Sequence, residues 1–203
     1  MKKSLLVLAL LAFLTAGAFA QGYFGLGGGA LLDMSFNNTV ASQTFAPYEG
    51  VMNIGPGAFA FFDFRYLEFD ISVGPGFLRT YDRDFNPIFP IVDDIWQLGI
   101  SILFKYPNDF KRENIDISLF PLFGANYNLV LPLEFRDSQF GLLAGGGIDW
   151  FLPRGHFLRL EAMFHLRFPS PDAADEAGRA RINSSLGMGP RIKFAWGYDL
   201  IWR

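Results

Sequence analysis

The chain has 203 residues, 51% of them hydrophobic, and a length that suits one domain or at most two. It has 24 Phe, 22 Gly and no Cys, which excludes a disulfide framework and the thiol that an N-terminal lipoprotein anchor needs. The formal net charge of −3 gives no reason to expect a nucleic-acid partner.

The first twenty residues have the layout of an export signal. Lys2 and Lys3 supply the positive start, and an apolar stretch follows from Leu5 to Leu14. A small-x-small cleavage site ends at Ala20, so the mature chain is expected to begin at Gln21. An uncleaved anchor is the alternative, but the apolar stretch is shorter than the roughly 20 residues that span a bilayer. We therefore expect a signal peptide over 1–20 and one domain over 21–203.

An alternation of apolar residues with other residues dominates the rest of the chain. In the first segment, Leu26 and Leu32 fall on one face while Gly25 and Asp33 fall on the other. A period of two over ten or more residues predicts β-strands. The predicted strands, in chain order, cover 23–36, 51–64, 67–77, 96–106, 115–128, 139–150, 158–168 and 182–202.

The connections alternate between long and short. Those at 37–49, 82–93, 129–138 and 169–181 are long, those near 65 and 153 are tight, and 107–114 is intermediate. The composition suits a membrane, yet no apolar run after residue 20 approaches 18 residues, which leaves a closed barrel. The sequence thus predicts an all-β fold, an eight-stranded antiparallel up-and-down transmembrane β-barrel with its short turns in the periplasm.

Alternation alone leaves a soluble barrel of lipocalin type as an alternative, with its apolar face inward. Two features favour the membrane. Charges on the polar face are few and are interspersed with glycine, which makes a poor water-facing surface. Aromatic residues gather at strand ends, as expected of a girdle at the membrane interface: Tyr106, Tyr127, Trp150, Tyr198 and Trp202.

The final strand carries the most specific resemblance. Gly197, Leu200 and Trp202 match a C-terminal pattern that the barrel-assembly machinery reads, although Ala195 replaces a polar residue and Arg203 adds one residue beyond the aromatic. The whole mature chain resembles the small eight-stranded outer-membrane barrels of OmpA-transmembrane-domain, OmpX and OmpW type. The resemblance implies the bacterial outer membrane as location, with outer-membrane lipid and the assembly machinery as partners.

Inward positions toward the periplasm carry many charges. Unpaired buried charge is costly, so we expect these residues to form a closed, structural plug. An ion-conducting constriction is the alternative. The predicted network consists of Asp63, Glu68, Asp70, Lys105, Asp116, Asp149, Arg159, Glu161, Arg191, Lys193 and Asp199.

Inward positions toward the exterior are mostly small or neutral, with many glycines. This pattern predicts a vestibule open to the outside. The alternative is that the glycines only relieve crowding in a tightly curved wall. The candidate vestibule residues are Asp33, Asn53, Gln97, Asn126, His165 and Arg167.

Three functions from different classes remain open. The first is a non-enzymatic barrel with a structural or surface-binding role. The second is a narrow channel for small apolar solutes with a lateral exit, as the OmpW-type resemblance implies, and the apolar loop residues Phe45, Phe85 and Ile88 would then line its mouth or form a lid. The third is a lipid-modifying enzyme, for which no Ser/His/acid trio emerges on the lipid face. We predict no catalytic residues, and His156 and His165 are too isolated to predict a metal or cofactor.

Two similar strings predict a weak seam. Gly55-Pro56-Gly57 and Gly74-Pro75-Gly76 flank a tight turn at 65–66. With that turn, paired residue numbers sum to 131 and Pro56 falls opposite Pro75 at a hydrogen-bonded position. Neither proline has an N–H, so both bonds of the pair are lost. The alternative is a bulge that shifts the register.

Overall fold

The computed structural model describes residues 23–37, 50–81, 92–112, 115–131, 138–168 and 186–201. Within these ranges no helix is long and apolar enough to cross a membrane. The strands are β1 (Gly25–Asn37), β2 (Gly50–Asp63), β3 (Leu67–Tyr81), β4 (Val92–Lys105), β5 (Asn108–Arg112), β6 (Ile115–Leu131), β7 (Gln139–Phe151), β8 (His156–Arg167) and β9 (Gly187–Asp199).

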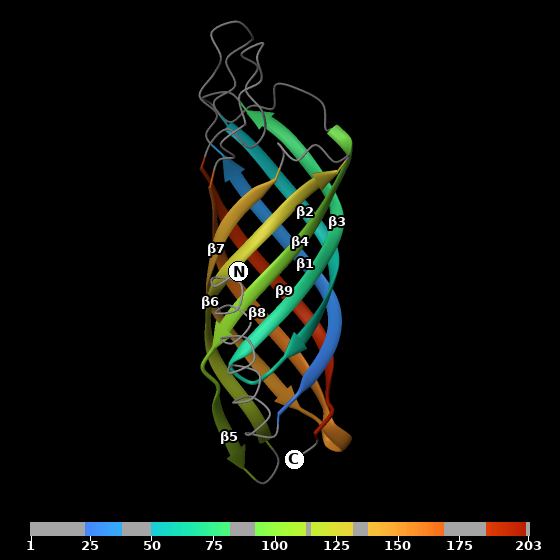
Figure 1. Cartoon of the computed structure of the whole chain (residues 1–203), viewed down its shortest axis with the longest axis vertical. Coiled ribbons are helices and arrows are strands. Elements are labelled where there is room, and N and C mark those ends of the chain that lie inside the picture. Colours follow the sequence, from blue (N-terminus) through green and yellow to red (C-terminus); the bar gives the residue numbers. More distant parts are fainter. Residues whose placement is uncertain are drawn as a thin grey trace, which may run out of the picture.

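The strands form one closed antiparallel sheet. Neighbours follow the order β4-β3-β2-β1-β9-β8-β7-β6-β5, and an additional β4–β6 pairing closes the barrel. Figure 1 shows the strands tilted around a tall, narrow barrel, with the β5–β6 hairpin at its lower end. Closure leaves the barrel strands without an unpaired edge, as a membrane requires.

β5 is the continuation of β4. Paired residue numbers sum to 227 both for Lys105 with Leu122 and for Asn108 with Leu119, so the two strands share one register along β6. Pro107, which has no N–H, interrupts them, while the Tyr106 N–H donates to the Pro121 carbonyl at 3.3 Å. If β4 and β5 are counted as one interrupted strand, the barrel has eight strands, which confirms the predicted fold class.

This continuation corrects one expected connection. The segment 107–114 was expected to be a turn only, yet residues 108–112 form a strand against β6. β4 stops pairing at Leu122, and β5 covers the edge of β6 that would otherwise be exposed. The hairpin thus extends beyond the wall on one side of the barrel (Figure 1).

The two tight turns lie where the sequence predicted them, and they define the turn end of the barrel. Arg65 adopts a φ of 66°, and its N–H donates to Asp63 Oδ1 at 2.9 Å. The Phe64 N–H closes the turn on the Leu67 carbonyl at 2.8 Å. At the second turn, Arg154 and Gly155 have φ of 66° and 80°.

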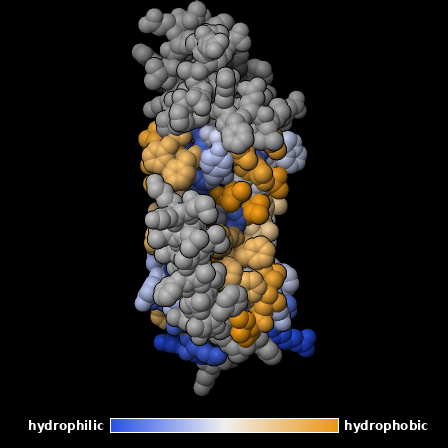
Figure 2. Space-filling model, in the orientation of Figure 1, coloured by the Kyte–Doolittle hydropathy of each residue, from blue (hydrophilic) through white to orange (hydrophobic). Residues whose placement is uncertain are grey.

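The outer wall is apolar. Along β9, the outward side chains of Ile192, Phe194 and Trp196 are 45%, 56% and 52% exposed, and the residues between them are buried. In Figure 2 hydrophobic residues make up much of the coloured wall, and the most hydrophilic ones gather at its lower end. This pattern is inside-out relative to a soluble barrel, so the lipocalin-type alternative is wrong and the wall is transmembrane.

Large apolar side chains also fill the lumen, which the sequence analysis did not anticipate. One buried cluster contains Leu31, Phe59, Phe61, Phe157 and Ala195. A second contains Leu103, Phe120, Leu122, Leu143 and Met163. An eight-stranded lumen is narrow enough for side chains to fill.

The last strand ends earlier than expected. β9 stops at Asp199, and Leu200–Ile201 form a turn in which the Leu200 N–H donates to the Phe24 carbonyl at 2.8 Å. Gly197 lies under the Phe157 ring, which a Cβ at this position would overlap. Trp202, the third residue of the predicted assembly signal, lies outside the described residues.

Candidate functional site

Arg159 is the centre of a charged plug in the half of the lumen near the turn end. Its Nε lies 2.6 Å from Asp149 Oδ1 and 3.8 Å from Glu161 Oε1. Its two terminal nitrogens pair with Asp63 and Glu68. The arginine comes from β8 and its partners from four strands, so one guanidinium ties together opposite sides of the barrel wall.

Three more cations complete the plug. Lys193 Nζ lies 2.6 Å from Asp70, 2.9 Å from Glu161 and 3.2 Å from Glu68. The Arg191 side chain lies 3.6 Å from Asp70, and Lys105 pairs with Asp63. Every carboxylate in this group faces at least one cation, which is the condition under which buried charge is tolerated.

Aromatic rings surround these cations. The Arg159 guanidinium lies 4.6 Å from the ring centre of Phe61, 5.1 Å from that of Phe157 and 5.5 Å from that of Phe120. Lys193 lies over Phe59 at 4.9 Å, and Lys105 lies over Phe120 at the same distance. Cation–π attraction strengthens when the groups are desolvated, so rings and ion pairs together close this half of the lumen.

Nine of the eleven residues predicted for the network meet in the plug: Asp63, Glu68, Asp70, Lys105, Asp149, Arg159, Glu161, Arg191 and Lys193. Asp116 does not, because it lies on the β5–β6 hairpin beyond the barrel, where its exposed carboxylate is 3.6 Å from Lys111 Nζ. Asp199 is buried at the turn end, where it accepts the Ile201 N–H at 3.1 Å.

Asp33 organises a second ion cluster above the plug. Its carboxylate lies 2.8 Å from Arg167 Nη2, 3.1 Å from His165 Nδ1 and 4.0 Å from Arg191 Nε. All four side chains are buried. The cluster joins β1 to β8 and β9, so it acts as a side-chain link between neighbouring strands.

The remaining vestibule residues lie in the same half of the lumen, but they do not line open water. Asn53 and Asn126 are buried, as are Asp33, His165 and Arg167, and only Gln97 is half-exposed. Asn128 and Gln139, which are directly paired across β6 and β7, belong with them, although neither was among the candidate vestibule residues. Their inward position in the alternation is the signal that identifies them.

The predicted seam is present between β2 and β3. Pairing runs to Ile54–Phe77 and resumes at Ala58–Val73, with the sum of 131 unchanged, so the alternative of a register shift is wrong. The three intervening pairs, Gly55–Gly57 against Gly74–Gly76, are missing from the ladder. Hydrogen-bonded pairs normally recur every two residues; here four residues separate them, roughly 14 Å of strand.

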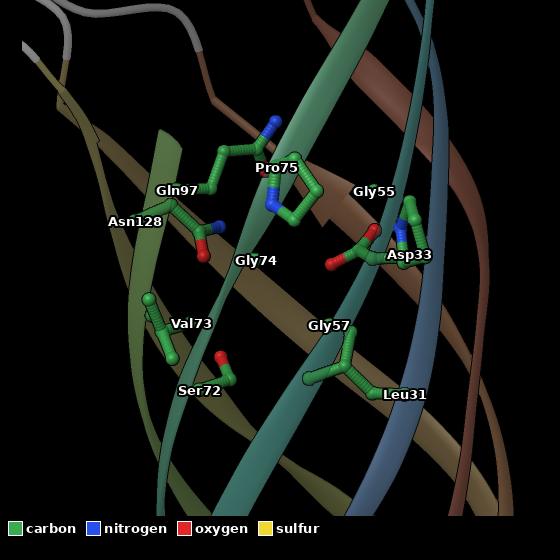
Figure 3. A pocket seen from close by; sticks show the side chains of 12 residues that line it. Leu31, Asp33, Gly55, Gly57, Ser72, Val73, Gly74, Pro75, Gln97 and Asn128 are labelled. Atoms are coloured by element: carbon green, nitrogen blue, oxygen red, sulfur yellow. The ribbon is translucent and has the colours of Figure 1, made fainter. Parts of the chain in front are cut away.

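Glycine keeps the seam narrow. A Cβ at Gly74 would overlap the Pro56 carbonyl oxygen, and one at Gly57 would lie 2.6 Å from the Val73 oxygen. The two backbones therefore stay in contact without hydrogen bonds. A small hollow lies against them, with Gln97 and Asn128 on one side and Asp33 and Leu31 on the other (Figure 3).

A second, smaller interruption lies between β1 and β9. Pairing skips Met34–Pro190 and Ser35–Gly189 and continues at Phe36–Met188 in the same register. Pro190 lacks the N–H that would donate to Met34, so this site loses one bond where the seam loses two. The Asp33 cluster spans this interruption through its links to His165 and Arg167.

No protein-family model matches the chain, and no curated protein matches it. Among solved structures, it is similar to the outer membrane protein OprG from Pseudomonas aeruginosa, with 14% identity, a TM-score of 0.49, and coverage of 88% of this chain and 96% of that one. It is also similar to Neisserial surface protein A, with 13% identity, a TM-score of 0.40, and coverage of 88% and 97%.

Proposed function

We propose that this chain is a bacterial outer-membrane barrel that admits small, largely apolar molecules from the extracellular side and releases them sideways into the outer leaflet. The observation that carries the proposal is the seam: three consecutive pairs are missing between β2 and β3 while the register is kept. A wall that lacks hydrogen bonds over this length separates more easily than the continuous ladders around it.

The plug supports a lateral route. Ion pairs and aromatic rings fill the half near the turn end. Short turns are typical of the periplasmic side, so we take this half to face the periplasm. A molecule that enters the lumen from the opposite end is therefore stopped by the plug. The nearest part of the wall that lacks hydrogen bonds is the seam. The hollow beside it has room for a water-sized group only, so passage requires the seam to widen.

A reversible disulfide across the seam, called the disulfide staple below, tests the proposal. The chain has no cysteine, so Gly55→Cys with Gly76→Cys introduces the only pair. These positions face each other at a non-hydrogen-bonded site, where Cα atoms lie roughly 4.5 Å apart and a disulfide is feasible. A Cβ at Gly55 makes only ordinary contacts, and one at Gly76 meets the end of the flexible Gln97 side chain.

The assay follows the entry of the apolar dye N-phenyl-1-naphthylamine into vesicles with a lipopolysaccharide outer leaflet. We expect the oxidised protein to take up dye no faster than protein-free vesicles, and reduction to restore uptake. A matched control is Ile71→Cys with Ile100→Cys, which joins β3 to β4 at a non-hydrogen-bonded position of the paired ladder, on the outer face and away from the hollow. Equal uptake by oxidised and reduced seam variants would leave a structural or surface-binding role as the function.

Planar-bilayer recordings test separately whether the charged plug closes the lumen to ions. The filled lumen predicts no large, steady conductance. A stable, porin-sized current would show that ions pass the plug and would replace the lateral route with an axial one.

A further inference from the structure

Four buried amide side chains surround the lumen above the plug. This amide belt consists of Asn53 on β2, Asn126 and Asn128 on β6, and Gln139 on β7, all at most 8% exposed. Five of their polar atoms have no hydrogen-bond partner among the described residues: Asn53 Oδ1, Asn126 Oδ1 and Nδ2, Asn128 Nδ2 and Gln139 Nε2. Buried polar groups in native proteins normally have a partner in protein, water or ligand.

Glycines make room for three of these amides. A Cβ at Gly99 would lie 2.9 Å from Asn128 Oδ1, one at Gly141 would overlap Asn126 Oδ1, and one at Gly76 would lie 3.3 Å from Asn53 Oδ1. The amide groups therefore occupy the volume that side chains of the neighbouring strands would fill. Unpaired donors and acceptors therefore lie in a space made by the absence of those side chains.

The belt reaches the hollow at the seam. Asn128 and Gln97 line one side of it (Figure 3). Pro56, Pro75 and the neighbouring Val73 line it at the wall, where Pro56 and Val73 are exposed on the outer face. The hollow thus has a polar end inside the lumen and an apolar end at the wall. A ligand that fits both ends has a small polar head and an apolar chain.

The charge of that head follows from the groups around it. The amides are neutral and offer both donors and acceptors. The nearest charged residue lining the hollow is Asp33, and its carboxylate is already engaged by Arg167 and His165. A charged head would enter a buried site without a free counter-ion, which is strongly unfavourable.

We propose that the amide belt is a head-group subsite for a neutral, hydroxyl-bearing amphiphile whose apolar chain leaves through the seam. This inference rests on the proposed lateral route and names the class of molecule that uses it. A hydroxyl both donates and accepts a hydrogen bond and is small enough for the hollow. A pure hydrocarbon would leave the amides unpaired.

The test compares three ligands with the same chain: dodecan-1-ol, dodecanoate and dodecylammonium. The full mature protein is offered all three at equal concentration and analysed by native mass spectrometry. We expect the alcohol adduct to exceed either charged adduct by about tenfold, a ratio that one or two net hydrogen bonds can produce. Asn128→Leu should bring the ratio close to one, while the matched Asn108→Leu on the exposed β5 hairpin should leave it unchanged.

A second variant keeps the test decisive if Asn128→Leu fails to fold. Asn128→Asp adds a carboxylate at the same position and should turn the preference toward dodecylammonium. Equal adducts of all three ligands in the unaltered protein would overturn the head-group subsite, while the disulfide staple would still report on the lateral route. Selective alcohol binding with no effect of the staple would instead uphold the subsite and overturn the route.

Discussion

The β2–β3 and β1–β9 ladders each lose pairs at proline, and the two sites differ in what holds them together. A third irregularity, between β3 and β4 at Gly76 and Leu78, shifts the register instead. At β1–β9 one bond is lost at Pro190, and the Asp33 cluster links the strands from inside. At the β2–β3 seam two bonds are lost, and no ion pair or side-chain hydrogen bond between described residues joins these strands at 54–58 and 73–77. Proline is common to both sites, so it does not distinguish them; the seam differs because no side-chain link among the described residues joins its two strands.

Breaking the link at the first interruption should have the largest effect. Asp33→Asn removes the only carboxylate facing His165 and Arg167 among the described residues. Losing one partner of a buried ion pair costs about 3–5 kcal/mol. Urea unfolding in detergent should show this loss, while Asp116→Asn, whose ion pair is exposed, should cost less than about 1 kcal/mol. Equal, small losses would mean that the cluster does not hold β1 to its neighbours.

Forcing the seam apart should have an intermediate effect. Gly74→Ala places a methyl group against the Pro56 carbonyl, whereas Gly55→Ala makes no contact closer than 3.5 Å. Overpacking of this kind costs about 1–3 kcal/mol. We expect the unfolding midpoint to fall for Gly74→Ala only, and dye uptake to rise with it. A drop of the same size in Gly55→Ala would point to a general loss of glycine freedom instead.

Restoring the missing donors should have the smallest effect. Pro56→Val with Pro75→Val returns two N–H groups to the seam, and Pro190→Val returns one to β1–β9. Each new bond is worth about 1 kcal/mol net. Thermal unfolding should therefore rise more for the double variant than for Pro190→Val. No gain in either would show that the carbonyls opposite the prolines are already well accommodated.

The register of the seam was predictable because a two-residue turn sets every pairing that follows it. With Phe64 and Leu67 as the closing pair, Pro56 had to meet Pro75, and it does. The β5 strand was not predicted, because Pro107 and the polar residues after it have the composition of a turn. Its register follows from β6, a partner that local sequence does not reveal.

The interior was predicted only in part. Reading apolar residues as lipid-facing hid Phe59, Phe61 and Phe120, although the same alternation that places Asp63 inward also places Phe59 and Phe61 inward. An open vestibule was one of two interpretations of the small inward residues, and the buried Asn126 argues against it. How far a side chain leans over a neighbouring glycine depends on the curvature of the closed wall, which alternation does not specify.

The continuous register of β4 and β5 gives the barrel one side that is taller than the others. Five residues of β5 correspond to roughly 17 Å along the strand. Phe110 on β5 and Ile115 on β6 are 52% and 50% exposed, so the added height is partly apolar. The other four β5 residues are polar or charged, and Asp109 pairs with Arg65 at 3.2 Å. We therefore expect the hairpin to stand in the water beyond the bilayer, where it gives the turn end of the barrel a charged projection on one side only.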